Sequence, residues 1–120
     1  CRDGKFIIGT PGPVANKKSP GTPFTAVGLN PGKRMLVLFV NDGRHKDDSP
    51  GIDFMNIGRF LVAVGCTEVV SIDGGGSSTM IIRDKEGGLD LVNRPSDNRK
   101  FDHDGARRVH NCLYLIENNR

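Results

Sequence analysis

The sequence predicts an α+β fold: β-hairpins forming a mixed sheet, with one clear helix packed on it. Two hairpin signals and further β-rich segments outnumber a single helical pattern, and that helix links two of the strands. At 120 residues, 36% of them hydrophobic, the chain is long enough for one domain with a core but too short for two. We therefore expect one small domain with frequent turns.

Residues 53–64 carry the best helical pattern. Asp53 suits the N-cap, Ile52 and Ile57 are spaced for a hydrophobic staple, and Gly65 suits the position after the last turn. Apolar residues at helical spacing predict one buried face, made of Phe54, Ile57, Leu61 and Val64.

Two hairpins are expected, one on each side of this helix along the chain. Residues 24–29 and 34–40 are β-rich, and the Asn-Pro-Gly-Lys turn between them suits type II, with the positive φ at Gly32. Because the second arm is apolar without alternation, it predicts a strand buried on both faces. The other hairpin pairs residues 80–83 with 89–93.

The remaining segments are two single strands and an N-terminal region. Residues 68–73 predict a strand after the helix, and 109–117 predict the last strand. Residues 1–23 are expected to form a short strand at 5–8 and a loop at 9–23 that is rich in Pro and Gly.

Charge and composition exclude several functional classes. The net charge is only +3, and the basic residues form no stripe interleaved with aromatic ones, so no nucleic-acid partner is expected. The longest apolar run is far shorter than the ~20 residues of a membrane-spanning helix. Cys and His residues lack zinc spacing, so neither a metal nor a cofactor is expected. Cys66 and Cys112 both flank strands and are candidates for a disulfide.

A glycine-rich segment after the 68–73 strand is the strongest local signal of function. It reads Asp-Gly-Gly-Gly-Ser-Ser-Thr over residues 73–79. Glycines let backbone N–H groups approach an anion and the hydroxyls add donors, which favours a phosphate or sugar site, although a structural tight turn explains the same residues. The pattern of a Walker loop, a dinucleotide fingerprint or a nucleophile elbow is absent.

Charged side chains follow the predicted strands. Asp73 is the leading candidate for a half-buried general acid or base, with a cap of the glycine turn as the alternative. Asp42 and Arg44 follow the 34–40 strand in the same way, where an ordinary turn is the alternative. We expect Asp42, Asp73 and Asn93 to lie near one cleft.

Residues 93–97, Asn-Arg-Pro-Ser-Asp, close the second hairpin. Arg94 offers a planar guanidinium that matches phosphate, and the neighbouring Asn, Ser and Asp side chains suit hydrogen bonds to sugar hydroxyls. The same residues are typical of a turn.

In their order along the chain, these segments resemble the phosphodiester glycosidase domain, a family that includes N-acetylglucosamine-1-phosphodiester α-N-acetylglucosaminidases. The resemblance spans about residues 21–117 and implies that 21–120 is the C-terminal part of such a domain. It rests on Thr25-Ala26-Val27-Gly28, Asp42-Gly43-Arg44 after a strand, the helix ending at Gly65, and the segments 73–79 and 93–97.

The resemblance implies a glycoside hydrolase that cleaves a sugar-1-phosphodiester, releasing the sugar and leaving the phosphate on its carrier. The catalytic carboxylates would be Asp73, Asp42 and Asp97. It also implies an extracytoplasmic location (secreted, periplasmic or cell-surface), with the N-terminal half of the domain or another protomer as a partner. The substrate-binding residues would be Arg44, Gly75, Gly76, Ser77, Ser78, Thr79, Asn93 and Arg94.

One departure from the family pattern supports a second hypothesis. An arginine usually precedes the Thr-Ala-(Ile/Val)-Gly strand, whereas this chain has Phe24. The alternative function is a non-catalytic carbohydrate- or phosphoglycan-binding domain on the same scaffold. A third interpretation is that the glycines only shape a turn in an assembly domain.

Overall fold

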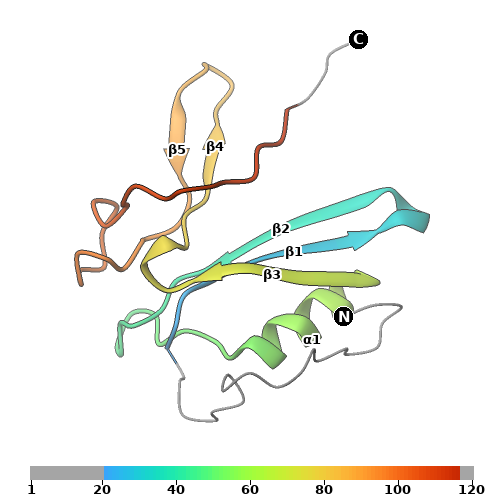
Figure 1. Ribbon diagram of the computed structural model, residues 1–120, viewed down its shortest axis with the longest axis horizontal. Coiled ribbons are helices and arrows are strands. Elements are labelled where there is room, and N and C mark those ends of the chain that lie inside the picture. The colour runs from blue at the N-terminus through green and yellow to red at the C-terminus, as the bar shows by residue number, and fades with distance from the viewer. Residues whose placement is uncertain (1–20, 117–120) are drawn as a thin grey trace.

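The computed structural model describes residues 21–116, which form a three-stranded sheet, a helix packed on it and a separate hairpin (Figure 1). The sheet has the order β2-β1-β3, and β4 pairs with β5, all neighbours being antiparallel. The predicted α+β class is confirmed. The strands are β1 (Phe24–Asn30), β2 (Met35–Asn41), β3 (Glu68–Gly74), β4 (Ile81–Arg83) and β5 (Leu89–Leu91).

The helix α1 (Phe54–Val64) begins and ends as its sequence predicts. The Asp53 carboxylate accepts a hydrogen bond from the backbone N–H of Asn56 at 3.0 Å, which satisfies one of the first N–H groups of the helix. Gly65 adopts a left-handed backbone with φ of 111°, and its N–H returns to carbonyl groups of the last turn.

The core lies between α1 and one face of the sheet. Ala26, Ile57, Leu61 and Cys66 are buried there. The predicted helix face is therefore only half correct, because Phe54 and Val64 are exposed.

Phe54 instead packs at the margin of this core. Its ring centroid lies 6.2 Å from that of Phe24, and Phe24 packs against the core residues.

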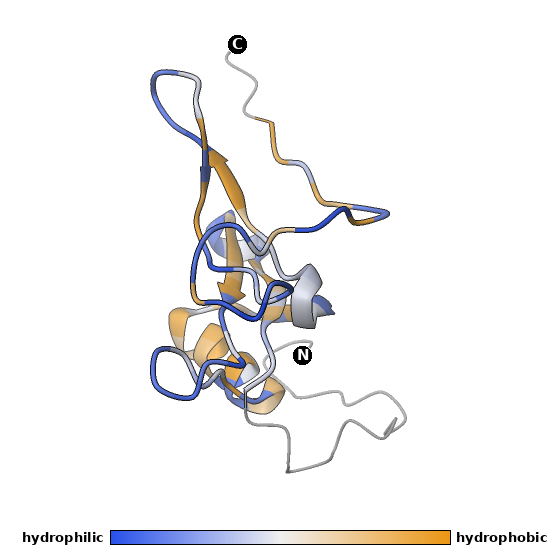
Figure 2. Cartoon of the chain, turned by 90° about the vertical axis from the view of Figure 1, so that its left-hand side faces the viewer, coloured by the Kyte–Doolittle hydropathy of each residue, from blue (hydrophilic) through white to orange (hydrophobic). Residues whose placement is uncertain are grey.

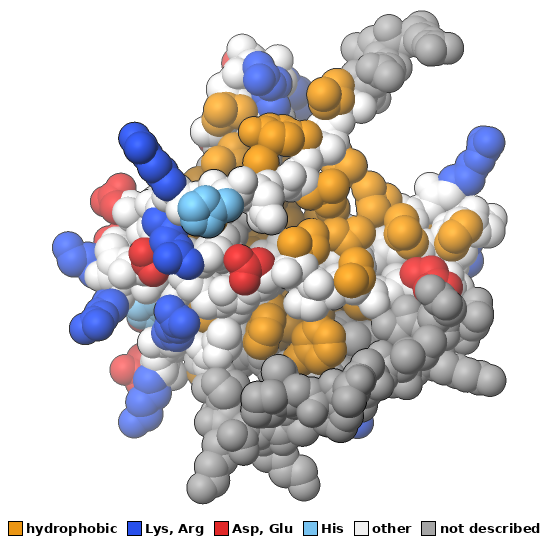
Figure 3. All heavy atoms as spheres, viewed as in Figure 1, with side chains coloured by type: hydrophobic (Ala, Val, Ile, Leu, Met, Phe, Trp, Pro, Cys, Tyr) orange, Lys and Arg blue, Asp and Glu red, His pale blue; other side chains and the backbone are white. Residues whose placement is uncertain are grey.

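The other face of the sheet is uncovered within the described residues. Side chains alternate along β2, so that Val37 and Phe39 pack toward α1 while Leu36 and Leu38 are exposed. The expectation that this strand is buried on both faces is wrong, because α1 supplies a layer on one face only. Figure 3 shows apolar side chains gathered in the middle of the view. In Figure 2 the helix lies at the opposite end of the molecule from the β4–β5 hairpin.

The connection between β1 and β2 differs from the predicted type II turn. Residues 31–33 form a short 3-10 turn, capped by the Asn30 side chain, which accepts the N–H of Lys33 at 3.1 Å. The positive φ falls on Arg34, at 51°, and not on Gly32. The Asn30 side chain takes the N–H of Lys33, so the backbone turn closes one residue later than expected. The N–H of Arg34 donates to the carbonyl of Pro31 at 3.1 Å.

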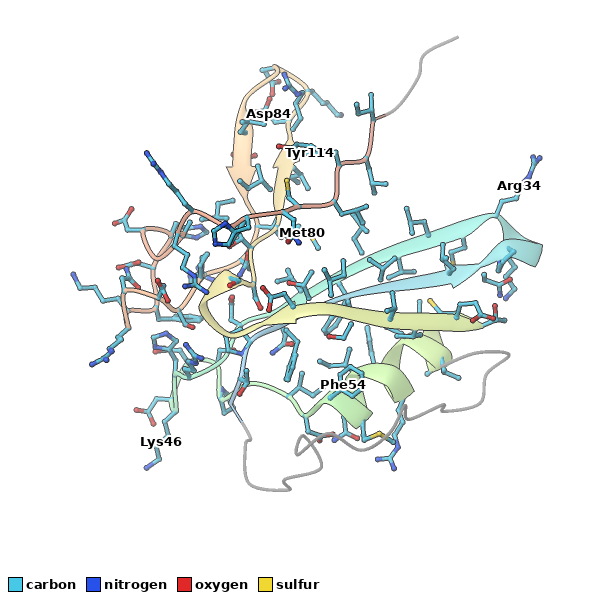
Figure 4. All side chains as sticks on the ribbon, in the orientation of Figure 1. Arg34, Lys46, Phe54, Met80, Asp84 and Tyr114 are labelled. Carbon is cyan, nitrogen blue, oxygen red and sulfur yellow. The ribbon has the colours of Figure 1, made fainter. Side chains whose placement is uncertain are left out.

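The second hairpin and the strand at 68–73 are confirmed, but the last strand is wrong. Residues 109–116 are exposed and belong to no sheet. Their apolar, β-rich sequence predicted a strand, yet no described strand edge is hydrogen-bonded to them. Tyr114 in this segment is 79% exposed (Figure 4).

Two further expectations concern the cysteines and the N-terminus. Cys66 is buried and Cys112 is exposed, and both are free thiols, so the predicted pairing is wrong. The predicted strand at 5–8 and most of the loop at 9–23 lie outside the described residues. Within residues 21–116 no helix combines the length and the apolar character that crossing a membrane requires.

Candidate functional site

The loops after β2 and β3 leave the sheet at the same end. Both strands run antiparallel to β1, and Phe24 of β1 pairs with Asn41 on one side and Gly74 on the other. The two strand ends are therefore separated by one strand, or about 10 Å at the usual spacing. Charged side chains gather at this end of the molecule (Figure 3).

Asn93 ties the loop after β2 to the glycine-rich segment. Its side-chain Nδ2 donates to Asp42 Oδ1 at 3.1 Å and to the backbone carbonyl of Ser78 at 2.8 Å. Its Oδ1 accepts the N–H of Met80, which lies at the base of β4 (Figure 4). The N–H of Arg94 donates to the same Asp42 oxygen at 2.8 Å. One buried amide thus fixes three chain segments.

The glycine-rich segment forms a short 3-10 turn over residues 75–77. Gly75 has a φ of 75°, and its N–H donates to the carbonyl of Pro23 at 2.8 Å. The N–H of Gly76 is at the start of the turn, where a 3-10 helix provides no acceptor. The Asp97 carboxylate lies against the Gly76 Cα, so close that a Cβ there would collide with it. Glycine at this position therefore brings an acidic group onto the turn.

Two guanidinium groups flank the same turn. Arg44 approaches Gly75, with Nη2 2.9 Å from the place a Cβ on that glycine would occupy, and its Nη1 is 3.5 Å from Ser96 Oγ. Arg107 donates from Nη2 to Ser77 Oγ at 2.6 Å. The turn is thus bordered by positive charge on two sides.

Arg107 is a residue that sequence reasoning missed. Its Nε also lies 3.8 Å from Asp97 Oδ2. Its partner Ser77 is 30 positions away in the sequence, and nothing in the Arg107-Arg108 doublet distinguishes one arginine from the other. Only the three-dimensional fold identifies it.

Asp73 is exposed, not half-buried as expected. A β-bulge precedes it: Thr25 pairs with Asp73 and Ala26 with Ser71, which leaves Ile72 as an extra residue on β3. Because Thr25 lies between residues that face α1, the pairing places Asp73 on the helix-free face.

The contact of the Asp73 carboxylate allows both interpretations of this residue. Asp73 Oδ1 accepts the N–H of Gly74 at 2.7 Å, the contact expected of a turn cap. Its exposure also leaves it accessible to a ligand at the same end of the sheet.

Two hydroxyls at the end of the segment have no hydrogen-bond partner among the described residues. They are Ser78 Oγ, on a fully buried residue, and Thr79 Oγ1. Buried hydroxyls without a protein partner are typical of places that hold water or a ligand group. The sequence had marked both as possible donors.

The backbone of Arg94 lies at this site, through its hydrogen bond to Asp42, but its guanidinium lies elsewhere. Its charged group stacks on the ring of Phe101, with Cζ 4.7 Å from the ring centroid. The ring of His45 lies on Phe101 as well, 5.2 Å between centroids. Phe101 and His45 carried no motif in the sequence. Within residues 21–116, no group of three or more His, Cys, Asp or Glu side chains comes together to hold a metal ion.

Comparison with known proteins identifies the family of this chain. The profile of the phosphodiester glycosidase family matches residues 2–116. No curated protein and no solved structure gives a significant match. Since the match covers almost the whole sequence, the chain belongs to the phosphodiester glycosidase family.

Proposed function

We propose that this chain hydrolyses a sugar-1-phosphodiester of the N-acetylglucosamine-1-phosphodiester type, releasing the sugar and leaving the phosphate on its carrier. The observation that carries the proposal is the arrangement around the glycine turn. Asp97, Arg44 and Arg107 border the turn, and Asp73 lies two residues before it in the chain. Family membership supports the class of reaction.

The reaction asks for two kinds of group. Water attacks the anomeric carbon, the bond from that carbon to the phosphate oxygen breaks, and the electron pair leaves with the phosphate. A carboxylate that accepts a proton from the water assists the attack. Positive groups and N–H donors stabilise the negative charge that develops on the departing phosphate. Carboxylates and guanidinium groups at one turn match this demand.

The three candidate carboxylates differ in their surroundings, and we assign their roles accordingly. Asp73 is the proposed base, because it is exposed and its only described partner is the adjacent backbone N–H. Asp97 lies beside Arg107 at the turn and is the second candidate. Asp42 receives hydrogen bonds from Asn93 and Arg94, so we assign it to positioning the loop after β5.

The remaining residues form the proposed binding surface. Arg44 and the turn residues Gly75, Gly76 and Ser77 would contact phosphate. The buried hydroxyls of Ser78 and Thr79 would line the site from beneath, where a bound water can bridge them to a phosphate oxygen. The Asn93 side chain is already fully engaged by the protein, so its proposed role is to hold the segment in place.

Release of N-acetylglucosamine from its methyl phosphodiester tests the proposal. The chain should release sugar, and Asp73→Asn should lower the rate by about 100- to 10,000-fold, the range for losing a general base. Asp90→Asn is the matched control, because Asp90 is an exposed carboxylate on β5. Equal rates in Asp73→Asn and the unmodified chain would contradict the assignment. Saturable binding without turnover would favour the non-catalytic carbohydrate-binding alternative.

A further inference from the structure

Arg107 is held by one edge of its guanidinium only. Nη2 donates to Ser77 Oγ at 2.6 Å, and Nε lies 3.8 Å from Asp97 Oδ2. These two nitrogens share one edge of the planar group. Within residues 21–116, Nη1 donates to no protein acceptor, so the end edge of the guanidinium is available.

This arrangement is poorly explained by stability alone. The Arg107 side chain is 50% exposed and that of Asp97 is 43% exposed, and ion pairs at such exposure contribute little to folding. Fixing a long side chain in one geometry also has an entropic cost. A fixed guanidinium with a free, accessible edge is instead suited to a planar, bidentate contact with an oxyanion.

The position of Arg107 identifies the kind of oxyanion. Its guanidinium lies at the Ser77 end of the glycine turn, while Arg44 lies at the Gly75 end. An anion on the turn therefore meets positive charge at both ends, while the Asp97 carboxylate against Gly76 is offset by its ion pair with Arg107. A phosphodiester has two non-bridging oxygens that share one negative charge, which suits two separate cationic contacts.

We propose that Arg107 binds a non-bridging phosphate oxygen of the substrate through its free edge, with Ser77 and Asp97 as the residues that position it. The inference rests on the proposed function and adds a substrate-binding residue that no sequence motif marks. It also gives Asp97 a second role, since its carboxylate orients the arginine that meets the phosphate.

Equilibrium binding measured by NMR with two ligands tests this inference. The probes are α-N-acetylglucosamine-1-phosphate and N-acetylglucosamine, which differ by the phosphate alone. Arg107→Gln should weaken binding of the sugar phosphate by about 10- to 100-fold, the range for a hydrogen bond to a charged group. The affinity of the Arg107→Gln variant for the free sugar should change less than about twofold, which is the usual error when effects at independent sites are added.

The neighbouring arginine provides the matched control. Arg108→Gln removes the same charge from an exposed residue that makes no described contact, and it should leave both affinities unchanged. Arg107→Lys keeps the charge but loses the planar, two-pronged guanidinium. Its affinity for the sugar phosphate should lie between those of Arg107→Gln and the unmodified chain. Thermal unfolding of each variant verifies that it is folded; if Arg107→Gln unfolds, Arg107→Lys carries the comparison.

Three results would overturn the inference, and they are distinguishable. Equal weakening of both ligands by Arg107→Gln would make Arg107 a structural residue. An unchanged affinity for the sugar phosphate would remove Arg107 from the site. Failure of the unmodified chain to bind sugar phosphate would overturn the proposed function itself, whereas the first two results concern Arg107 alone.

Discussion

The Asn93 side chain donates a hydrogen bond to the Asp42 carboxylate across 51 positions of sequence, with 3.1 Å between Nδ2 and Oδ1. The same amide nitrogen reaches the backbone carbonyl of Ser78. The loop after β2, the glycine turn and the segment after β5 are therefore joined at one buried residue. The geometry of the candidate site depends on this joint.

Removing the amide of Asn93 should destabilise the protein. Asn93→Ala leaves a buried carbonyl and part of a carboxylate without donors, which costs about 1–3 kcal/mol in the free energy of unfolding. Urea unfolding measures this change. The control is Asn111→Ala, at an exposed position, where the free energy should change by less than about 0.5 kcal/mol. Similar values for the two variants would show that the joint is unimportant.

Filling the space at Gly76 should lower activity more than stability. A Cβ at this position collides with the Asp97 carboxylate, which can rotate away, and also comes within 3.1 Å of Asp97 Cβ, which must shift slightly. Gly76→Ala should therefore displace Asp97 from the turn, lowering the rate of sugar release by about tenfold or more while the unfolding free energy changes by about 1 kcal/mol.

The control for the Gly76 variant is another glycine outside the core. At Gly32 a Cβ would meet only the Asn30 side chain, at 3.5 Å. Gly32→Ala should retain full activity. A Gly76→Ala variant as active as Gly32→Ala would contradict the placement of Asp97 at the site.

The core prediction concerns α1. Leu61 is fully buried between the helix and the sheet, so Leu61→Ala should lower the unfolding free energy by about 2–5 kcal/mol. Val64, three residues along the same helix, is exposed, and Val64→Ala should cost less than about 1 kcal/mol. If denaturant unfolding gives the two variants equal stability, the packing described for α1 is wrong.

The pH response of the 98–104 loop follows from Asp102. Hydrogen bonds from the Asn98 side chain and from the Asp104 backbone, with smaller effects of Lys100 and His103, lower the pKa of the Asp102 carboxyl. Because the folded-state pKa is lowered, this group stabilises the loop above its unfolded-state pKa. That stabilisation is lost as pH falls through the lower, folded-state value.

An NMR titration of the loop measures this effect. The Asp104 amide resonance should shift at a pH below the ordinary Asp range, and Asp102→Asn should abolish the shift. A midpoint at or above the ordinary Asp value would contradict the described hydrogen bonds.

The two described cysteines should differ in reactivity. Burial raises the pKa of the Cys66 thiol, so little thiolate forms at neutral pH, whereas Cys112 is exposed. Alkylation followed by peptide mapping should label Cys112 within minutes and Cys66 only after denaturation. Labelling of Cys66 in the folded protein at the rate of Cys112 would place it outside the core.

The elements that were correctly predicted are those with local signals. The helix was delimited by its own cap at Asp53 and by Gly65, and the β4–β5 hairpin by its glycine turn. The strand predicted at 109–116 was wrong because a strand needs a neighbouring strand to pair with. The sequence of the segment does not show whether a sheet edge is available. The predicted burial of β2 on both faces was wrong for a similar reason, since an apolar run does not show how many layers cover the strand. Leu36 and Leu38 are exposed.

The residues of the candidate site also divide into those with a local sequence signal and those without one. The positions of Asp42, Asp73 and the glycine segment at the ends of strands were predictable from the sequence, and their roles in catalysis and binding stay predictions. Arg107 was not predictable, because its contact with Ser77 joins a residue from an irregular segment to a turn 30 positions earlier. The stacking of Arg94 on Phe101 was equally hidden, since cation–π pairs leave no sequence spacing.

The position of bond cleavage decides whether this site acts as a glycosidase. Hydrolysis of the methyl phosphodiester of N-acetylglucosamine in water enriched in oxygen-18, followed by mass spectrometry of both products, shows which bond breaks. Attack at the anomeric carbon predicts the heavy oxygen in the released sugar and none in methyl phosphate. Heavy oxygen in the phosphate would mean attack at phosphorus, and would contradict the assignment of this site as a glycosidase.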